Sequence, residues 1–172
     1  KAGKDGKAPS QALELDTLVG GGNGEILIDN HGDRADEMVS MMNMDKEFNY
    51  KISTFHHAVE SYKIADLLAK DGVCSAMWAD WWGFKLEAFD GVDENIPMVA
   101  KANACAIVHS DDANGIQRLN QEAAKAWADG KKVGINFTRA EVMTWLTLNA
   151  AKALGIADKT GSLEKGKMAD VV

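Results

Sequence analysis

Basic charge and long apolar runs are both scarce in this sequence. The 19 lysines and arginines stand against 26 aspartates and glutamates, which gives a formal net charge of −7. Because the acidic residues are spread along the chain, no basic stripe offers a surface for nucleic acid or for an anionic membrane. No apolar run approaches the roughly 20 residues that a membrane-spanning helix needs. We therefore expect neither a nucleic-acid partner nor a membrane partner.

Cysteine is equally scarce, and the start of the chain lacks the apolar segment of a signal peptide. The two cysteines, Cys74 and Cys105, are widely separated, so they predict neither a metal knuckle nor a disulfide framework, and we expect buried free thiols. The stretch from Lys1 to Gly6 is polar, but a truncated N-terminus would remove any targeting segment. The sequence therefore does not distinguish a cytoplasmic protein from one of a bacterial periplasm.

The residues that are present have the composition of a globular protein. The 172 residues are 46% hydrophobic and 26% charged, which is enough for one sizeable core and excludes disordered and fibrous proteins. The stretch from Lys1 to Ser10 is polar and predicts a loop, followed by a short helix over Gln11 to Val19 that a run of glycines breaks.

Short apolar runs then alternate with stretches of helical periodicity. The four runs predict strands near Ile26–Asn30, Tyr50–His56, Val73–Trp78 and Cys105–His109. Helical spacing of apolar residues follows the first, second and fourth of these runs. Such alternation predicts a parallel sheet with helices outside it, which is either doubly wound or a (β/α) barrel.

The last predicted helix carries its own start and stop signals. Thr138 and Glu141 have the spacing of a capping box, and Gly155 follows the last apolar residue of the pattern. The sequence therefore predicts one long helix between them.

Ionisable residues follow three of the predicted strands. His31, His57 and Asp111 each lie just past the last apolar residue of a strand. In a (β/α) barrel those strand ends converge on the face that carries catalytic groups, and two imidazoles with a carboxylate suit zinc or a similar divalent ion. The alternative is that these residues are solvated loop residues or helix caps on a non-catalytic, doubly wound domain that binds other molecules or has a structural role.

Three segments resemble barrel strands five, six and eight of the amidohydrolase superfamily: His31 to Glu37, Thr54 to Tyr62 and His109 to Asp111. The branch with imidazolonepropionases and related metal-dependent dipeptidases is the most similar, and it also covers the loop from Trp78 to Lys85. The segment from Gly161 to Val172 resembles the stretch by which these enzymes return to a small β-sandwich domain.

The resemblance implies the C-terminal half of a (β/α)8 barrel over residues 1–155 and the start of the return to the β-sandwich over residues 156–172. It makes His31 and His57 ligands of one or two divalent ions, zinc above all. It makes Asp111 both a ligand and the base that takes a proton from water. The implied activity is hydrolysis of a C–N bond in an amide, cyclic amide or dipeptide, or, as an alternative, that of an Xaa-Pro dipeptidase or carboxypeptidase-like peptidase.

The chain also departs from the family's pattern. A His-x-His pair on the first barrel strand and a lysine or glutamate on the fourth would precede His31, and neither is present. A complete barrel needs about 250 residues. We therefore expect a fragment that is inactive alone, from a homo-oligomeric enzyme acting on a small molecule or dipeptide.

Several neighbours of the candidate ligands have two interpretations. His56 and His57 are adjacent, so only one faces the barrel axis if the strand is regular, and the resemblance favours His57. His109 is expected either to contact substrate or to pack in the core, and Arg34 either to bind a substrate carboxylate or to pair with Asp36. Trp82, with its neighbouring tryptophans, is expected either to wall a substrate pocket or to pack beside the loop.

Overall fold

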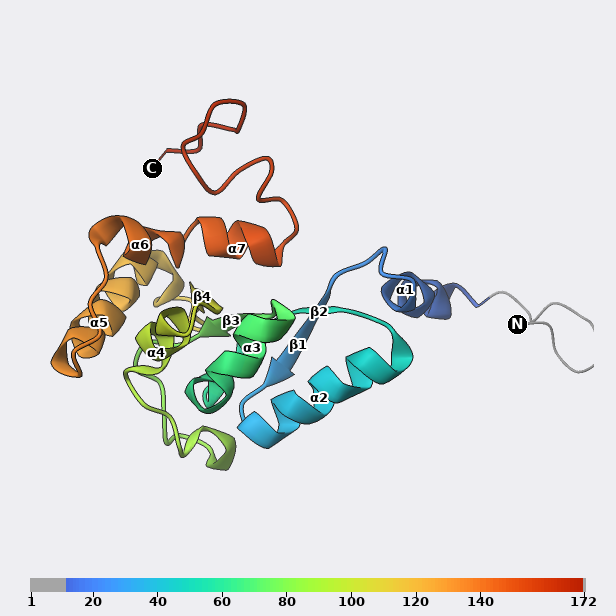
Figure 1. The fold of residues 1–172 in the computed structure, drawn as a ribbon, viewed down its shortest axis with the longest axis horizontal. Helices are drawn as coiled ribbons and strands as arrows, with labels where there is room; N and C mark the ends of the chain where they lie inside the picture. Colours follow the sequence, from blue (N-terminus) through green and yellow to red (C-terminus); the bar gives the residue numbers. More distant parts are fainter. Residues whose placement is uncertain (1–11, 172) are drawn as a thin grey trace, which may run out of the picture.

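The structure is a computed structural model that describes residues 12–171. Its centre is a four-stranded sheet of β1 (Ile28–Gly32), β2 (Ile52–His57), β3 (Cys74–Met77) and β4 (Cys105–Val108). The strands lie in sequence order and all pair in parallel, with helices between them, as Figure 1 shows. The predicted parallel α/β fold is confirmed, with strand bounds that differ from the predicted ones by at most two residues.

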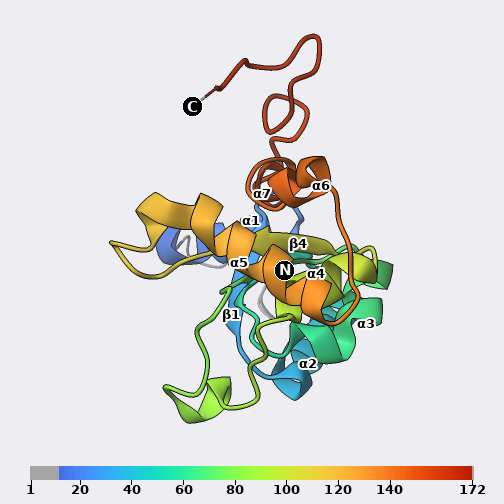
Figure 2. The same cartoon turned by 90° about the vertical axis from the view of Figure 1, so that its left-hand side faces the viewer.

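The helices are α1 (Leu13–Gly22), α2 (Ala35–Phe48), α3 (Ala65–Asp71), α4 (Asn95–Lys101), α5 (Leu119–Lys132), α6 (Arg139–Thr144) and α7 (Leu148–Ala153), with short 3-10 turns η1 (Ser61–Ile64), η2 (Leu86–Ala88) and η3 (Ile116–Arg118). The segment that follows α7 runs away from the sheet in both Figure 1 and Figure 2. None of the helices in the described part of the chain is long and apolar enough to cross a membrane.

Alternation along the strands divides the core between the two faces of the sheet. Phe55, Met77 and Val108 point to the face covered by helices, where they join the main buried cluster with residues such as Met38 and Leu68. Strand residues on the opposite face form a smaller cluster with Ala153 of α7: Cys74, Ala76 and Ile107. The sheet is therefore apolar on both faces, as a parallel sheet usually is.

The two cysteines correct one expectation from the sequence. Cys74 and Cys105 form a disulfide, and no free cysteine remains. They are 31 positions apart in the sequence, but each begins its strand, and the parallel register pairs them directly across β3 and β4. The prediction of free thiols is wrong because the pairing of β3 with β4 brings together two cysteines that are far apart in the sequence.

Breaking this disulfide is expected to destabilise the fold. The bond closes a loop of about 30 residues, for which restriction of the unfolded chain is worth about 3.7 kcal/mol. Reduction of the full-length protein should therefore lower its free energy of unfolding by about 2–5 kcal/mol in urea titrations. The double variant Cys74→Ala/Cys105→Ala is the control, because reductant should leave its unfolding curve unchanged. Identical wild-type curves with and without reductant would show that the bond does not stabilise the protein.

The ends of the first helix differ from their predicted positions. Helix α1 continues through Gly20, Gly21 and Gly22, where the sequence predicted a break, and it ends before Gly24, whose φ is +75°. The polar loop predicted for Lys1 to Ser10, and Gln11 at the start of the predicted helix, lie outside the described residues.

The capping box is confirmed, but the long helix predicted after it is two helices. Thr138 Oγ1 accepts a hydrogen bond from the Glu141 amide, and the Thr138 amide donates to Glu141 Oε2. The chain leaves helical geometry between α6 and α7, at Thr147. Nearby, the Trp145 carbonyl accepts a hydrogen bond from the Val108 amide at 3.1 Å. This contact ties the connection between the two helices to the end of β4.

The predicted return to a β-sandwich has no counterpart in the described residues. Gly155 follows α7 with φ +68°, as a helix stop does, and residues 156–171 form turns without a strand. A β-sandwich after the barrel therefore stays a prediction.

Candidate metal centre

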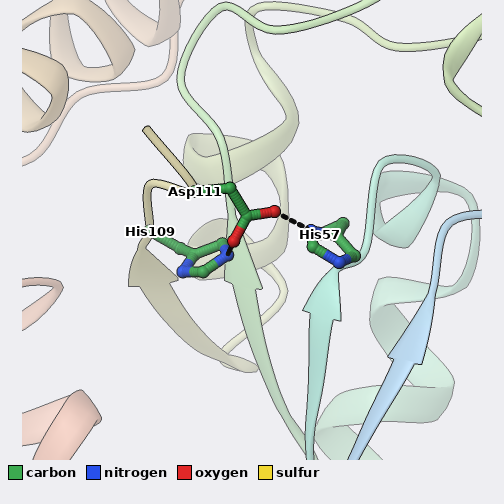
Figure 3. Close-up of side chains that lie close together, drawn as sticks. All are labelled: His57, His109 and Asp111. Carbon is green, nitrogen blue, oxygen red and sulfur yellow. Dashed lines mark ion pairs between the residues drawn. The ribbon is translucent and has the colours of Figure 1, made fainter. Parts of the chain in front are cut away.

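The candidate site lies at the carboxyl ends of the parallel strands. His31 lies near the end of β1, His57 ends β2, and His109 directly follows β4, with Asp111 two residues further on. Figure 3 shows the side chains of His57, His109 and Asp111 turned toward one another above the strand ends. The parallel order of the strands therefore gathers residues that are up to 80 positions apart in sequence.

The carboxylate of Asp111 lies between two imidazole rings. Its Oδ2 is 3.0 Å from Nδ1 of His57, and its Oδ1 is 3.1 Å from Nε2 of His109. On the other side of the His57 ring, Nε2 lies 2.6 Å from Nδ1 of His31. The structure thus places His31 and Asp111 on opposite sides of the His57 ring, and it is His109, not His31, that lies with His57 around Asp111. The roles of these residues as ligands stay predictions.

Two buried ring nitrogens in this group have no hydrogen-bond partner. They are His57 Nδ1 and His109 Nε2, which face the carboxylate of Asp111 at ion-pair distance without the alignment of a hydrogen bond. Burial lowers the pKa of both imidazoles, and the charge of Asp111 only partly opposes this effect. Neutral imidazoles beside a carboxylate are a donor set that binds zinc.

The fit to a divalent ion also appears in the spacing of these groups. One ligand atom from each of His57, His109 and Asp111 lies within 4.8 Å of the others. A four-coordinate zinc has ligands at about 2.0–2.2 Å, which places neighbouring ligand atoms between 3 and 4 Å apart. These three residues therefore fit the divalent ion that the sequence predicted, with His109 in the place of His31.

The end of β2 explains how two consecutive histidines reach the same group. His57 has φ +67° and Ala58 has φ +47°, so the strand is not regular there. The ring of His56 lies 5.3 Å from that of His109, and the ring of His57 lies 4.7 Å from that of His31. Only one of His56 and His57 would face the site if the strand were regular, and the strand is not regular here. A non-glycine residue in the left-handed region costs about 1–3 kcal/mol, and such residues cluster at functional sites.

The loop after β3 covers the candidate centre with aromatic side chains. The buried ring of Trp78 lies 4.6 Å from that of His57 and is nearly parallel to that of His109 at 6.4 Å. Trp82, which is 58% exposed, lines a cavity of about 10 Å³ with His57 and Trp78, which is room for about one water. Apolar rings therefore limit the access of water to the histidines.

Sequence reasoning did not single out an ion pair beside the histidines. Lys85 Nζ donates to Oδ2 of the buried Asp33, whose other carboxylate oxygen has no partner. Asp33 lies two residues after His31, and this period-two spacing was the available signal that the two share a face. The pair links the end of β1 to the tryptophan loop.

Arg34 adopts the second of its two predicted arrangements. Its Nε and one terminal nitrogen donate to the two carboxylate oxygens of Asp36, each at 3.0 Å. This hydrogen bonding lowers the pKa of Asp36. The guanidinium is therefore already engaged by a carboxylate of its own chain.

Comparison with known proteins places this fold and site in context. Residues 90–172 match the Amidohydrolase family. The curated protein Amidohydrolase tasK of Hapsidospora irregularis is 26% identical over 165 residues, which are 93% of this chain and 16% of the relative. An amidohydrolase structure from Thermotoga maritima MSB8 has a TM-score of 0.79 at 24% identity, over 97% of this chain and 42% of that one.

A second solved structure extends the likeness to a protein with a metal. An adenosine deaminase from Xanthomonas campestris, solved with bound zinc, has a TM-score of 0.63 at 19% identity, over 92% of this chain and 38% of that one. The chain thus spans less than half the length of each of these proteins. Together these matches confirm the resemblance to the amidohydrolase superfamily and show the fold as a portion of an amidohydrolase chain.

Proposed function

We propose that this chain, from the amidohydrolase superfamily, forms the C-terminal half of the catalytic barrel of a metal-dependent hydrolase, over residues 1–155. The reaction would be hydrolysis of a C–N bond in an amide, cyclic amide or dipeptide. The observation that supports this most directly is the carboxylate of Asp111 between the unpartnered ring nitrogens of His57 and His109. A carboxylate beside neutral imidazoles serves both to bind a cation and to move a proton.

His31, His57 and Asp111 are the residues that would hold the ion. A bound divalent cation supplies a Lewis acid that makes water nucleophilic near pH 7 and polarises the attacked carbonyl. Asp111 then accepts a proton from the attacking water at a carboxylate oxygen and later delivers it to the nitrogen of the leaving amine. The ring of Trp78 limits the entry of other water and so strengthens each electrostatic contact inside the site.

Some parts of the proposed enzyme lie outside this chain. The resemblance implies a His-x-His pair and a lysine or glutamate on earlier barrel strands, and these would complete the set of ligands. We therefore propose that activity needs the longer protein, which we expect to form homo-oligomers. Within this chain, Arg34, His109 and Trp82 are the proposed substrate contacts, and His109 is the one that already lies against Asp111.

The proposal has a narrower form, in which the enzyme is a peptidase, and a competing one, in which the domain has no catalytic activity. An Xaa-Pro dipeptidase or carboxypeptidase-like peptidase would need a cation that holds the carboxylate of the substrate. A non-catalytic α/β binding domain would need no metal, and the unpartnered nitrogens of His57 and His109 argue against it.

Metal removal tests the proposed function in the full-length protein. The protein should hydrolyse members of a panel of dipeptides, N-acyl amino acids and cyclic amides. A chelator such as 1,10-phenanthroline should abolish this hydrolysis, because the reaction relies on a bound ion, and added zinc should restore it. Rates and zinc content are measured on the same samples. A full-length protein that binds no metal and cleaves nothing in the panel would support the binding domain instead.

A further inference from the structure

A cleft of about 260 Å³ opens beside the candidate metal centre. His109, which contacts Asp111, forms part of its wall, so the cleft is continuous with the proposed site of hydrolysis. Trp78 and Trp81 form an aromatic wall, with their rings 5.3 Å apart. A cleft of this size next to a reactive centre has room for part of a small substrate.

The charged side chains that line this cleft have a hydrogen-bond or ion-pair partner, with one exception. Lys125 binds Asp80 at 2.9 Å and Glu122 at 2.7 Å. Asp112 accepts a hydrogen bond from the amide of Gly115. Within residues 12–171, by contrast, the guanidinium of Arg118 has neither an ion pair nor a hydrogen bond. The cleft therefore presents one cation whose charge no neighbouring carboxylate neutralises.

The three arginines of the chain occupy different environments. Arg34 is held by both carboxylate oxygens of Asp36. Arg139 begins α6 and lines none of the described cavities. Arg118 alone combines a free guanidinium with a position in the cleft next to His109. It is therefore the arginine best placed to meet an anion that is bound at the candidate centre.

We propose that Arg118 binds a carboxylate of the substrate, and that the substrate is a dipeptide or an N-acyl amino acid with a free carboxylate near the cleaved amide. This inference rests on the proposed function. The planar guanidinium matches a carboxylate with two parallel hydrogen bonds. The rings of Trp78 and Trp81 provide the apolar wall for the rest of the substrate.

The test compares a dipeptide with its C-terminal amide, because only the dipeptide carries the carboxylate that Arg118 is proposed to bind. The readout is the ratio of kcat/KM for the dipeptide to kcat/KM for its amide, in the full-length, zinc-loaded protein. In the wild type this ratio should be well above one. Arg118→Gln should lower it about 10- to 100-fold, the size expected for a lost hydrogen-bonded charge pair. Zinc content and the unfolding midpoint of the variant are measured to show that fold and metal are retained.

Two matched variants identify which arginine is responsible. Arg139→Gln removes the same charge away from the cleft and should keep the ratio close to that of the wild type, whereas Arg34→Gln tests the other arginine that is a proposed substrate contact. Three results would overturn the assignment of Arg118 and leave the proposed hydrolase unaffected. They are a wild-type ratio near one, an equal loss of kcat/KM on both substrates in Arg118→Gln, and a selective loss on the dipeptide in Arg34→Gln instead. A wild-type protein without metal and without activity on either substrate would overturn the proposed function and this assignment together.

Discussion

Replacing Asp111 with asparagine is expected to reduce kcat of the full-length enzyme about 10²- to 10⁴-fold, the range for removal of a general base. Asparagine keeps the size of the side chain but cannot take a proton from water. The fold should persist, because the side chain of Asp111 is 42% exposed and follows the last strand. Turnover, zinc content and thermal unfolding measured on the same preparation separate loss of the base from loss of structure.

The charge of Asp111 also predicts what happens to the neighbouring rings. This charge raises the pKa of both His57 and His109, so its removal lowers the pKa of both. Both imidazoles therefore stay neutral at pH 7 and able to bind an ion. We expect the asparagine variant to keep part of its zinc, and Asp112→Asn is the matched control, with near-normal turnover. Near-normal turnover in Asp111→Asn with zinc bound would show that the assigned base is wrong.

His57→Ala is expected to act on metal binding first and on activity as a consequence. The ring of His57 contacts His31 on one side and Asp111 on the other, so its removal takes away a nitrogen donor at the centre of the group. The loss of metal affinity should exceed the roughly 10- to 100-fold that is typical when an outer partner of a ligand is removed. His31→Ala should behave in the same way, and excess zinc should restore part of the activity in both variants.

The neighbouring histidine supplies the matched control. His56 contacts the rings of His31 and His109, and its Nε2 lies 4.0 Å from Asp29 Oδ2. Because the resemblance assigns the ligand to His57, His56→Ala should cost less metal affinity than His57→Ala. Zinc titrations of the metal-free variants measure the difference. The reverse order would reassign the ligand on β2 to His56.

The sequence predicts the sheet well because its strands are short apolar runs that end in polar residues. The run before His31 and the run before His57 locate β1 and β2 to within a few residues. Helix α4 had no such signal, since Pro97 falls within a helix of only seven residues. The long helix expected up to Gly155 is divided because the chain between its halves bonds to the edge of β4, and the linear pattern does not show this contact.

The candidate site is only partly predictable for a similar reason. Strand-end positions and the resemblance were enough to select His31, His57 and Asp111. His56 reaches the site because His57 has a positive φ. A positive φ is uncommon for residues other than glycine, so the sequence does not indicate it. The disulfide between Cys74 and Cys105 depends on the register of two strands. Contacts across the sheet, rather than local patterns, decide these features.

The position of a bound ion tests the central claim most directly. Crystals of the full-length protein grown with zinc should show an anomalous scattering peak within about 2.0–2.2 Å of ring nitrogens of His31 and His57 and of a carboxylate oxygen of Asp111. A peak coordinated by His57, His109 and Asp111 without His31 would contradict the assigned set of ligands. The absence of any peak at these strand ends, in crystals where zinc binds elsewhere on the protein, would contradict the metal centre itself.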